Sequence, residues 1–177
     1  MQALRLPLVR ISILIVSVAL VALTITWTYL GMRAVMDIGG ACATGGPYVP
    51  VQPCPQGASV LISVAPPVLL LATFAGTGVA VTIKAPTLLL PMWVLLFGSL
   101  GWNFLEYAFK GNGVEISWLV CGIVFEAMAL PAAALLVVAA PSVPGDDTTG
   151  RGRWWLLYAA VGAAGLLAGL WSFQSWT

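Results

Sequence analysis

The stretch ISILIVSVALVALTITWTYLGM, residues 11–32, contains no charged residue and is bounded by Arg10 and Arg33. A helix needs about 20 apolar residues to cross the hydrocarbon core of a bilayer, and this stretch has that length. Trp27 and Tyr29 near its end are typical of a membrane interface. The run is too long for a signal peptide and no small-residue cleavage motif follows it, so we interpret it as a retained membrane anchor.

Four more stretches of the chain have the same apolar character. Of the 177 residues, 60% are hydrophobic and only 7% are charged, and the mean hydropathy is +1.01. A soluble domain averages about 25% charged residues. We therefore predict an all-α integral membrane protein, with five transmembrane helices in one bundle and a single polytopic membrane domain over residues 1–177. The predicted spans are 11–32, 58–83, 87–108, 116–140 and 154–173.

The orientation of these spans follows from the distribution of lysine and arginine, which concentrate in cytoplasmic loops. A cytoplasmic N-terminus places Arg5, Arg10, Lys84, Arg151 and Arg153 inside and only Arg33 and Lys110 outside. We therefore expect a multi-pass protein of the plasma (cytoplasmic) membrane with an extracytoplasmic C-terminus. Residues 33–57 then form the first outer loop.

Two of the three cysteines, Cys42 and Cys54, lie in this loop and are separated by eleven residues. Disulfides persist in oxidising, extracytoplasmic compartments. The spacing is unlike the C-x-x-C motif of thiol oxidoreductases, and two thiols in a chain without histidine make a poor zinc site. We predict a disulfide that braces the outer loop, to which the loop-entropy model assigns about 3 kcal/mol. A membrane thiol oxidoreductase that uses this pair stays as a weaker alternative.

One charged residue, Glu126, falls near the middle of a predicted span. A carboxylate at that depth costs roughly 2.5–3.5 kcal/mol on insertion scales, so we expect it to be protonated, hydrogen-bonded or bound to a cation. Helical spacing places it on one face with Gly122 and Ala129, which favours contact with another helix. Polar residues at similar depth predict an intramembrane polar cluster of Glu126, Thr73, Thr77 and Ser99. Glu126 then either pins the helix register as a neutral group or carries protons, a cation or a polar substrate.

The end of the third predicted span, GWNFLEYAFK (residues 101–110), gathers aromatic and polar side chains. Glu106 and Lys110 have the i,i+4 spacing of a helix-stabilising ion pair. The predicted outer-interface residues are Trp102, Asn103, Glu106 and Tyr107. They form either an aromatic belt with a charged edge or the mouth of a polar cavity that leads toward Glu126 and receives a lipid headgroup or a partner helix.

The last predicted span carries a G-x-x-x-G pair, Gly165 and Gly169, with Gly162 one turn earlier. Small residues at this spacing allow close helix packing. The sequence leaves open whether these glycines pack within the bundle or against a second copy or a partner subunit.

The absence of histidine excludes Ser–His–Asp and Cys–His catalysis, and a net charge of +1 gives no electrostatic case for nucleic acid. We expect no metal and no cofactor. The sequence favours a non-enzymatic accessory or interaction subunit with a disulfide-stapled outer loop. Its expected partners are membrane lipid and either a membrane-protein partner or further copies of itself. The alternative is a small transporter or proton-coupled carrier that uses Glu126.

Overall fold

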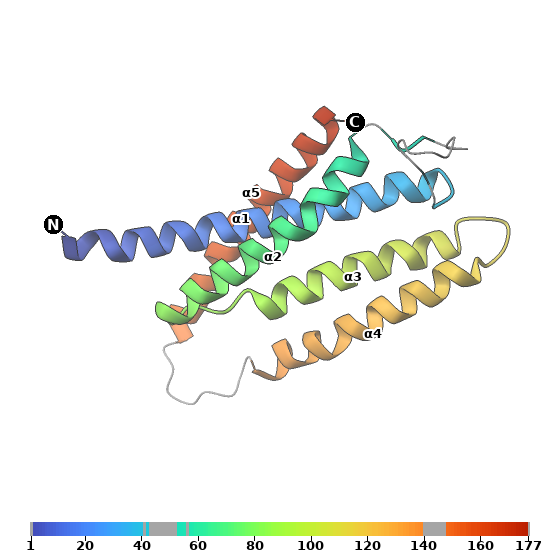
Figure 1. The fold of residues 1–177 in the computed structure, drawn as a ribbon. Coiled ribbons are helices and arrows are strands. Elements are labelled where there is room, and N and C mark those ends of the chain that lie inside the picture. Colours follow the sequence, from blue (N-terminus) through green and yellow to red (C-terminus); the bar gives the residue numbers. More distant parts are fainter. Residues whose placement is uncertain (1, 41, 43–52, 56, 140–147, 177) are drawn as a thin grey trace.

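The computed structural model describes residues 2–40, 42, 53–55, 57–139 and 148–176, which fold into five α-helices (Figure 1). The helices are α1 (Gln2–Asp37), α2 (Ala58–Thr82), α3 (Leu89–Ala108), α4 (Ile116–Ala139) and α5 (Thr148–Trp176). All five are long and apolar enough to cross a membrane, so the all-helical prediction is confirmed. Residues 41, 43–52 and 56 of the predicted outer loop and residue 140 of the predicted fourth span lie outside the described residues.

The helices begin and end close to the predicted boundaries, and α1 and α5 deviate most. α1 extends beyond the apolar run at both ends, from Gln2 to Asp37. Its last turns therefore carry Arg33 and Asp37 on an ordered helix, whereas the sequence placed both residues in a loop. This extension determines the geometry of the site described below.

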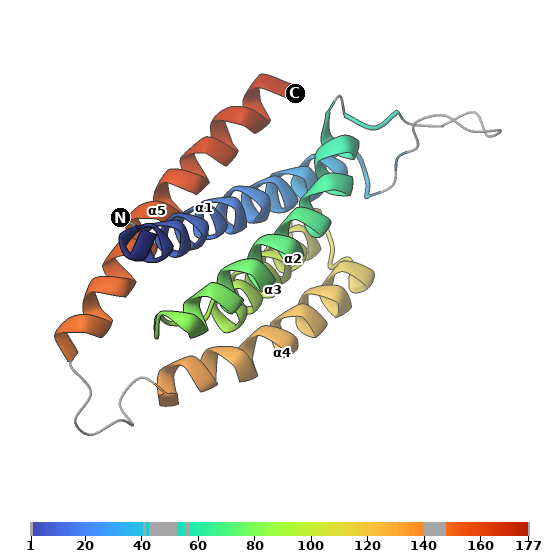
Figure 2. The ribbon, with the colours of Figure 1, turned by 60° about the vertical axis from the view of Figure 1, so that its left-hand side comes forward.

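The central helix of the bundle is α1, which packs against α2, α5 and α3. α3 and α4 form a hairpin, and α4 packs chiefly against α3. Figure 2 shows α5 and α4 at opposite edges of the molecule, with α1, α2 and α3 between them. We call the end of the bundle with Cys42 and Cys54 the disulfide end, and the opposite end, with the α2–α3 connection, the turn end.

Two apolar clusters hold the three central helices together. One combines Leu14 and Val18 of α1 with Ala80 of α2 and with Tyr158 of α5. The other places Val21, Ile25, Leu69, Ala72 and Met92 between α1, α2 and α3. Small residues let the helices approach, because a Cβ at Gly76 would lie 2.7 Å from the Cβ of Ser17.

A short turn ends α2 and starts the path to α3. Lys84 adopts a left-handed conformation with φ 56°, and the amide of Ala85 donates to the carbonyl of Ala80 at 2.9 Å. This is the hydrogen bond of a Schellman motif, which satisfies a carbonyl that the helix end leaves free. The connection between α2 and α3 thus begins with a helix-terminating motif that has lysine at the position that usually holds glycine.

The interface between α3 and α4 combines small residues with a ladder of aromatic rings. A Cβ at Gly122 would lie 2.8 Å from Leu105, so α4 approaches α3 closely at that point. Beside it Phe125 stacks on Phe104 with ring centroids 5.4 Å apart, and Trp118 stacks on Tyr107 at 5.6 Å. Offset stacked pairs of this kind add to the energy of area burial.

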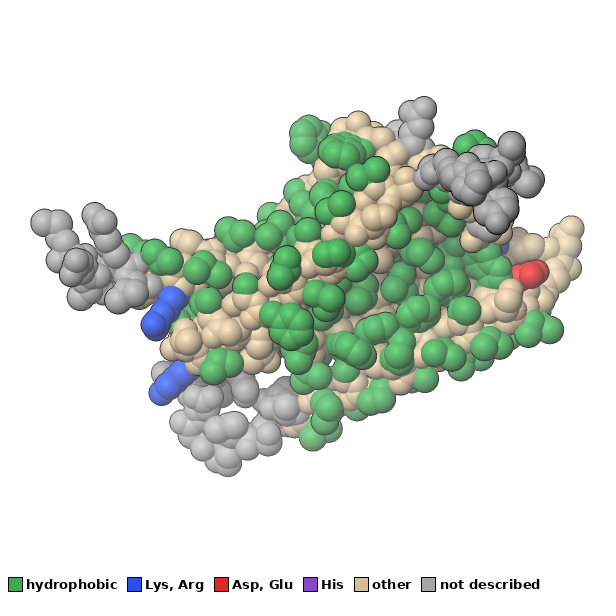
Figure 3. Space-filling model, in the orientation of Figure 1, with side chains coloured by type: hydrophobic (Ala, Val, Ile, Leu, Met, Phe, Trp, Pro, Cys, Tyr) green, Lys and Arg blue, Asp and Glu red, His purple; other side chains and the backbone are tan. Residues whose placement is uncertain are grey.

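Large apolar side chains cover the outward faces of the described helices, as Figure 3 shows for one face of the molecule. Leu71, Val137 and Trp171 each expose more than 70% of their surface. A soluble monomer rarely shows contiguous apolar surface on this scale. This exposed apolar surface is consistent with a multi-pass membrane protein.

Candidate functional site

Seven polar and charged side chains meet at the disulfide end and join α1 to α3. They come from one face of each helix, at spacings of three or four residues that bring side chains into line. We call this group the α1–α3 polar cluster; its members are Tyr29, Arg33, Asp37, Asn103, Glu106, Tyr107 and Lys110.

The guanidinium of Arg33 is the centre of the cluster. Its Nη1 and Nη2 donate to the two carboxylate oxygens of Glu106 at 2.6 and 2.8 Å, a bidentate ion pair. Nη1 also lies 3.2 Å from the Tyr29 hydroxyl and 3.2 Å from the Asn103 Oδ1. Bidentate arginine–carboxylate pairs are the stronger class of charged hydrogen bond and restrict the relative orientation of the two groups. Arg33 therefore determines the register of α1 against α3.

Asn103 is fully buried beside this ion pair and connects it to the backbone of α1. Its Nδ2 donates to the carbonyl of Tyr29 at 3.1 Å, while its Oδ1 accepts from Arg33. A buried amide without partners would cost free energy, and both ends of this one are satisfied. Asn103 thus allows a charged pair to form at a point where the two helices are in contact.

A second ion pair lies one turn further along the helices. Asp37 accepts from the hydroxyl of Tyr107 at 2.5 Å and from the ammonium of Lys110 at 2.8 Å. The Lys110 ammonium also lies 4.3 Å from the centre of the Tyr107 ring. The hydrogen bond to Asp37, with that to Tyr107, raises the pKa of Lys110 above its ordinary value. Lys110 therefore stays charged at neutral pH.

The predicted i,i+4 ion pair between Glu106 and Lys110 does not form, because each of the two residues pairs with a residue of α1 and Lys110 lies beyond the end of α3. Glu106 pairs with Arg33 and Lys110 pairs with Asp37. Of the four predicted outer-interface residues, the structure brings Asn103, Glu106 and Tyr107 into the cluster. Trp102 is 62% exposed and is not a member of the cluster. The cluster carries two positive and two negative charges and is neutral as a whole.

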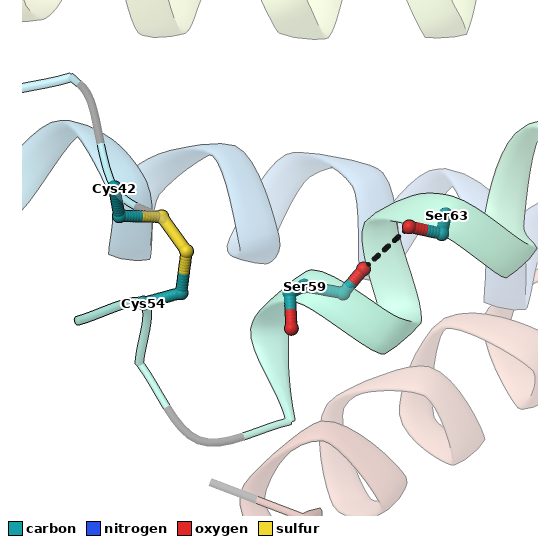
Figure 4. The surroundings of a disulfide bond; sticks show 4 residues. All are labelled: Cys42, Cys54, Ser59 and Ser63. Carbon is teal, nitrogen blue, oxygen red and sulfur yellow. Dashed lines mark hydrogen bonds between the residues drawn. A yellow bond between two sulfur atoms is a disulfide. The ribbon is translucent and has the colours of Figure 1, made fainter. Parts of the chain in front are cut away.

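The disulfide predicted between Cys42 and Cys54 is present and closes the connection between α1 and α2 (Figure 4). In Figure 4 it lies just before the first turn of α2, where Ser63 donates to the carbonyl of Ser59. The third cysteine, Cys121, is free and exposed on α4. It lines a pocket of about 330 Å³ together with Trp118 of α4, residues of α1 and α3, and Gly40, which follows α1.

We expect the double variant Cys42→Ser, Cys54→Ser to lower the free energy of unfolding by about 1 kcal/mol, less than the 3 kcal/mol of an unconstrained loop of this size. α1 and α2 pack along their length, and a denatured state that keeps these helices close already restricts the loop between them. Chemical unfolding in detergent micelles measures the difference, with Cys121→Ser as the control. A loss of 3 kcal/mol or more would contradict this expectation.

The predicted intramembrane cluster around Glu126 is not joined by hydrogen bonds in the described part of the chain. Thr73 donates to the carbonyl of Leu69 and Ser99 to that of Leu96, each within its own helix. The Thr77 hydroxyl is buried without a partner. Glu126 lies instead over Gly101 of α3, where an added Cβ would come within 2.7 Å of its Oε1.

The three glycines predicted to pack α5 take two different positions. Gly165 lies against the backbone of Ala19, and a Cβ at Gly169 would lie 2.8 Å from the Thr26 Cβ, so both pack on α1. A Cβ at Gly162 would meet no atom within 4 Å. The G-x-x-x-G pair therefore packs α5 against α1 within the bundle, whereas Gly162 does not take part in this packing.

Sequence reasoning missed the α1 half of the polar cluster. Tyr29, Arg33 and Asp37 follow one another at intervals of four, which places them on one helical face. Asn103, Glu106, Tyr107 and Lys110 show the matching pattern on α3. The complementary order of charges, basic then acidic at the end of α1 and acidic then basic at and just after the end of α3, was the available signal for two parallel helices whose opposite charges pair at the same height.

The described residues contain no group of three or more His, Cys, Asp or Glu side chains that could hold a metal ion. No protein-family model matches the chain, and searches of curated proteins and of solved structures find no match.

Proposed function

We propose that the chain is a non-enzymatic accessory subunit of the plasma membrane, whose disulfide end lies outside and docks a partner membrane protein. The observation that carries this proposal is the concentration of cross-links at that end. The disulfide ties α1 to α2, the polar cluster ties α1 to α3, and Trp27 donates to the Ser172 hydroxyl of α5 at 2.8 Å. A rigid surface loses little conformational entropy on binding, which favours its use as a docking platform.

The charges at the two ends support the proposed orientation. Arg33 and Lys110, the basic residues placed outside, are each neutralised by a carboxylate. At the turn end Arg10, Lys84 and Arg153 are exposed and make no ion pair with any described residue; Figure 3 shows blue side chains projecting there. Unneutralised positive charge favours the cytoplasmic side.

Labelling of single cysteines tests this orientation. In a background with Cys121→Ala, we expect Asn112→Cys, between α3 and α4, to react with a membrane-impermeant maleimide in intact cells. Lys84→Cys, in the turn before α3, should react only after lysis. The reverse pattern would refute a cytoplasmic N-terminus.

Site-specific photo-crosslinking in native membranes tests the docking role. A photoreactive residue at Trp102, exposed beside the polar cluster, should capture one partner of constant mass, and the same residue at Leu135, exposed on the turn-end half of α4, should not. The adduct at position 102 should weaken when Cys42 and Cys54 are replaced by serine. Equal capture from both positions, or none from either, would refute a docking surface at the disulfide end.

A carrier that uses Glu126 is the second candidate, and one observation favours it. Glu126 is a half-buried carboxyl in the middle of α4, and no described residue hydrogen-bonds to it. Ionisable residues at such depth commonly lie on ion or proton pathways. The absence of a hydrogen-bonded cluster with Thr73 and Ser99 weakens this candidate, because a carrier site requires several polar groups around its cargo.

Replacement of Glu126 by glutamine separates the two roles, because glutamine keeps the size and the hydrogen-bonding capacity but cannot carry a proton. For the accessory role we expect unchanged abundance in the membrane and unchanged crosslinking from Trp102. Proton flux into vesicles that contain the purified protein is measured with a pH-sensitive dye. It should be at background level for the wild type and for Glu126→Gln. Flux that the wild type shows and Glu126→Gln loses would refute the accessory role in favour of the carrier.

A further inference from the structure

An apolar groove of about 600 Å³ runs along the middle of the bundle between α1, α3 and α5. It exists because α5 packs against α1 but not against α3, so the space beside α1 stays open between the two. Its walls include Ile25 of α1, Leu95 of α3 and Ala159, Gly162, Ala163 and Leu166 of α5. Figure 2 shows α5 and α3 apart from each other, with α1 between them in that view.

Each hydroxyl that lines the groove already makes a hydrogen bond within the protein. Four hydroxyls line it, and three of them donate to a backbone carbonyl of the protein: Thr26 to Ala22 at 2.9 Å, Ser99 to Leu96 at 3.0 Å and Tyr158 to Pro86 at 2.7 Å. The Tyr29 hydroxyl accepts from Arg33. A polar ligand would lose its hydrogen bonds to water without replacement. The chemistry of the walls therefore selects a purely aliphatic occupant.

The volume of the groove favours a single hydrocarbon chain over a protein helix as its occupant. A 20-residue helix about 10 Å across and 30 Å long fills on the order of 2,400 Å³, so it could place only one face in the groove, whereas a hydrocarbon tail could lie wholly inside it. Pockets of about 300–1,000 Å³ ordinarily hold one small organic molecule. A single hydrocarbon tail lying along α1 matches this volume and makes dispersion contacts with all three walls.

Gly162 belongs to this groove and not to the packing of α5 on α1. A Cβ at Gly165 or Gly169 would collide with α1, whereas a Cβ at Gly162 would meet open space. Glycine at this position has no packing role within the described residues and widens the groove instead.

We propose that this groove holds one acyl chain of a membrane phospholipid. This inference rests on the membrane insertion proposed above. In this arrangement α5 forms one wall of the lipid site. It packs on α1 through Gly165 and Gly169, and the acyl chain fills the space between α5 and α3.

Photolabelling with a phosphatidylcholine that carries a diazirine in the middle of one acyl chain tests the proposal in reconstituted vesicles. Adducts located by peptide mass spectrometry should concentrate on Ala159, Gly162, Ala163 and Leu166, at several times the level found on Leu71 and Phe74, which are exposed on α2. Gly162→Leu and Ala163→Leu should each reduce the groove adducts about fivefold by filling the space. Ala164→Leu is the matched control, because Ala164 is exposed on the same helix but does not line the groove, and it should leave them unchanged.

The outcomes separate the occupant from the insertion. Equal labelling of the groove and of α2, or groove labelling that both filling variants retain, would overturn the acyl-chain site while leaving membrane insertion intact. A further outcome is a wild type that is a dimer in detergent and that Gly162→Leu converts to a monomer. That result would assign the groove to a second copy of the protein and would also overturn the acyl-chain site. Absence of adducts on every helix would overturn membrane insertion itself, and the lipid site with it.

Discussion

Replacement of Gly165 by leucine is expected to release α5 from the bundle. An added Cβ at this position would collide with the backbone carbonyl of Ala19, and it would lie 3.0 Å from the Cβ of Ala22. Neither is the flexible end of a side chain, so the helices must separate. Because α5 packs mainly on α1, separation removes most of its contacts. Overpacking typically costs about 1–3 kcal/mol, and against backbone we expect about 3–5 kcal/mol in the free energy of unfolding.

The measurement is chemical unfolding in detergent micelles, together with protease sensitivity of the segment around Thr148. Gly162→Leu is the matched control, because it makes the same change one turn earlier on the same helix without contacting α1. It should unfold within about 0.5 kcal/mol of the wild type, as substitutions away from contacts do. If Gly165→Leu unfolds like Gly162→Leu, the close contact between α1 and α5 is not formed in the protein.

Replacement of Arg33 by methionine is expected to have the second largest effect. It removes the bidentate pair with Glu106 and leaves the Oδ1 of the buried Asn103 without its donor. Hydrogen bonds to charged groups contribute about 1.5–3 kcal/mol each, and the Arg33 and Glu106 side chains are 27% and 37% exposed, so solvent recovers part of this. We expect Arg33→Met to lower the free energy of unfolding by about 2 kcal/mol. The double variant Arg33→Met, Glu106→Gln should recover about half of this loss.

The Lys110–Asp37 pair is the internal control for this double-mutant cycle. Its side chains are 53% and 54% exposed, so Lys110→Met should leave the free energy of unfolding nearly unchanged. Equal losses for Arg33→Met and Lys110→Met would show that burial beside Asn103 does not strengthen the Arg33–Glu106 pair. A loss that Glu106→Gln does not reduce would place the effect of Arg33 outside the ion pair.

Part of the candidate site was predictable from the sequence and part was not. Asn103, Glu106 and Tyr107 were identified because polar residues at the end of an apolar span stand out. Arg33 and Asp37 were taken as the start of a loop, since a charge after an apolar run usually marks the end of a span. The helix continues through them because Glu106 of α3 and Lys110, two residues after its end, neutralise both charges, a contact between residues about 70 positions apart.

Glu126 shows the opposite case. Its depth and its small neighbours were correctly read as a face for close helix packing, and it lies against Gly101 of α3. The hydroxyls expected around it instead bond to carbonyls of their own helices, as Thr73 does. Similar depth along a membrane normal says nothing about the rotation of each helix, and rotation decides whether two side chains meet.

The sequence by itself determined the number of helices, their approximate ends and the pairing of Cys42 with Cys54. These features depend on local properties: the length of each apolar run, the positions of its charges and the number of cysteines available in one loop. Only the tertiary structure decided which helices touch. It placed α1 at the centre, joined Arg33 to Glu106, and left α5 apart from α3 so that a groove opens beside Gly162. In an apolar environment all helix faces look alike to a hydrophobicity pattern, so close packing and a few polar contacts select the arrangement.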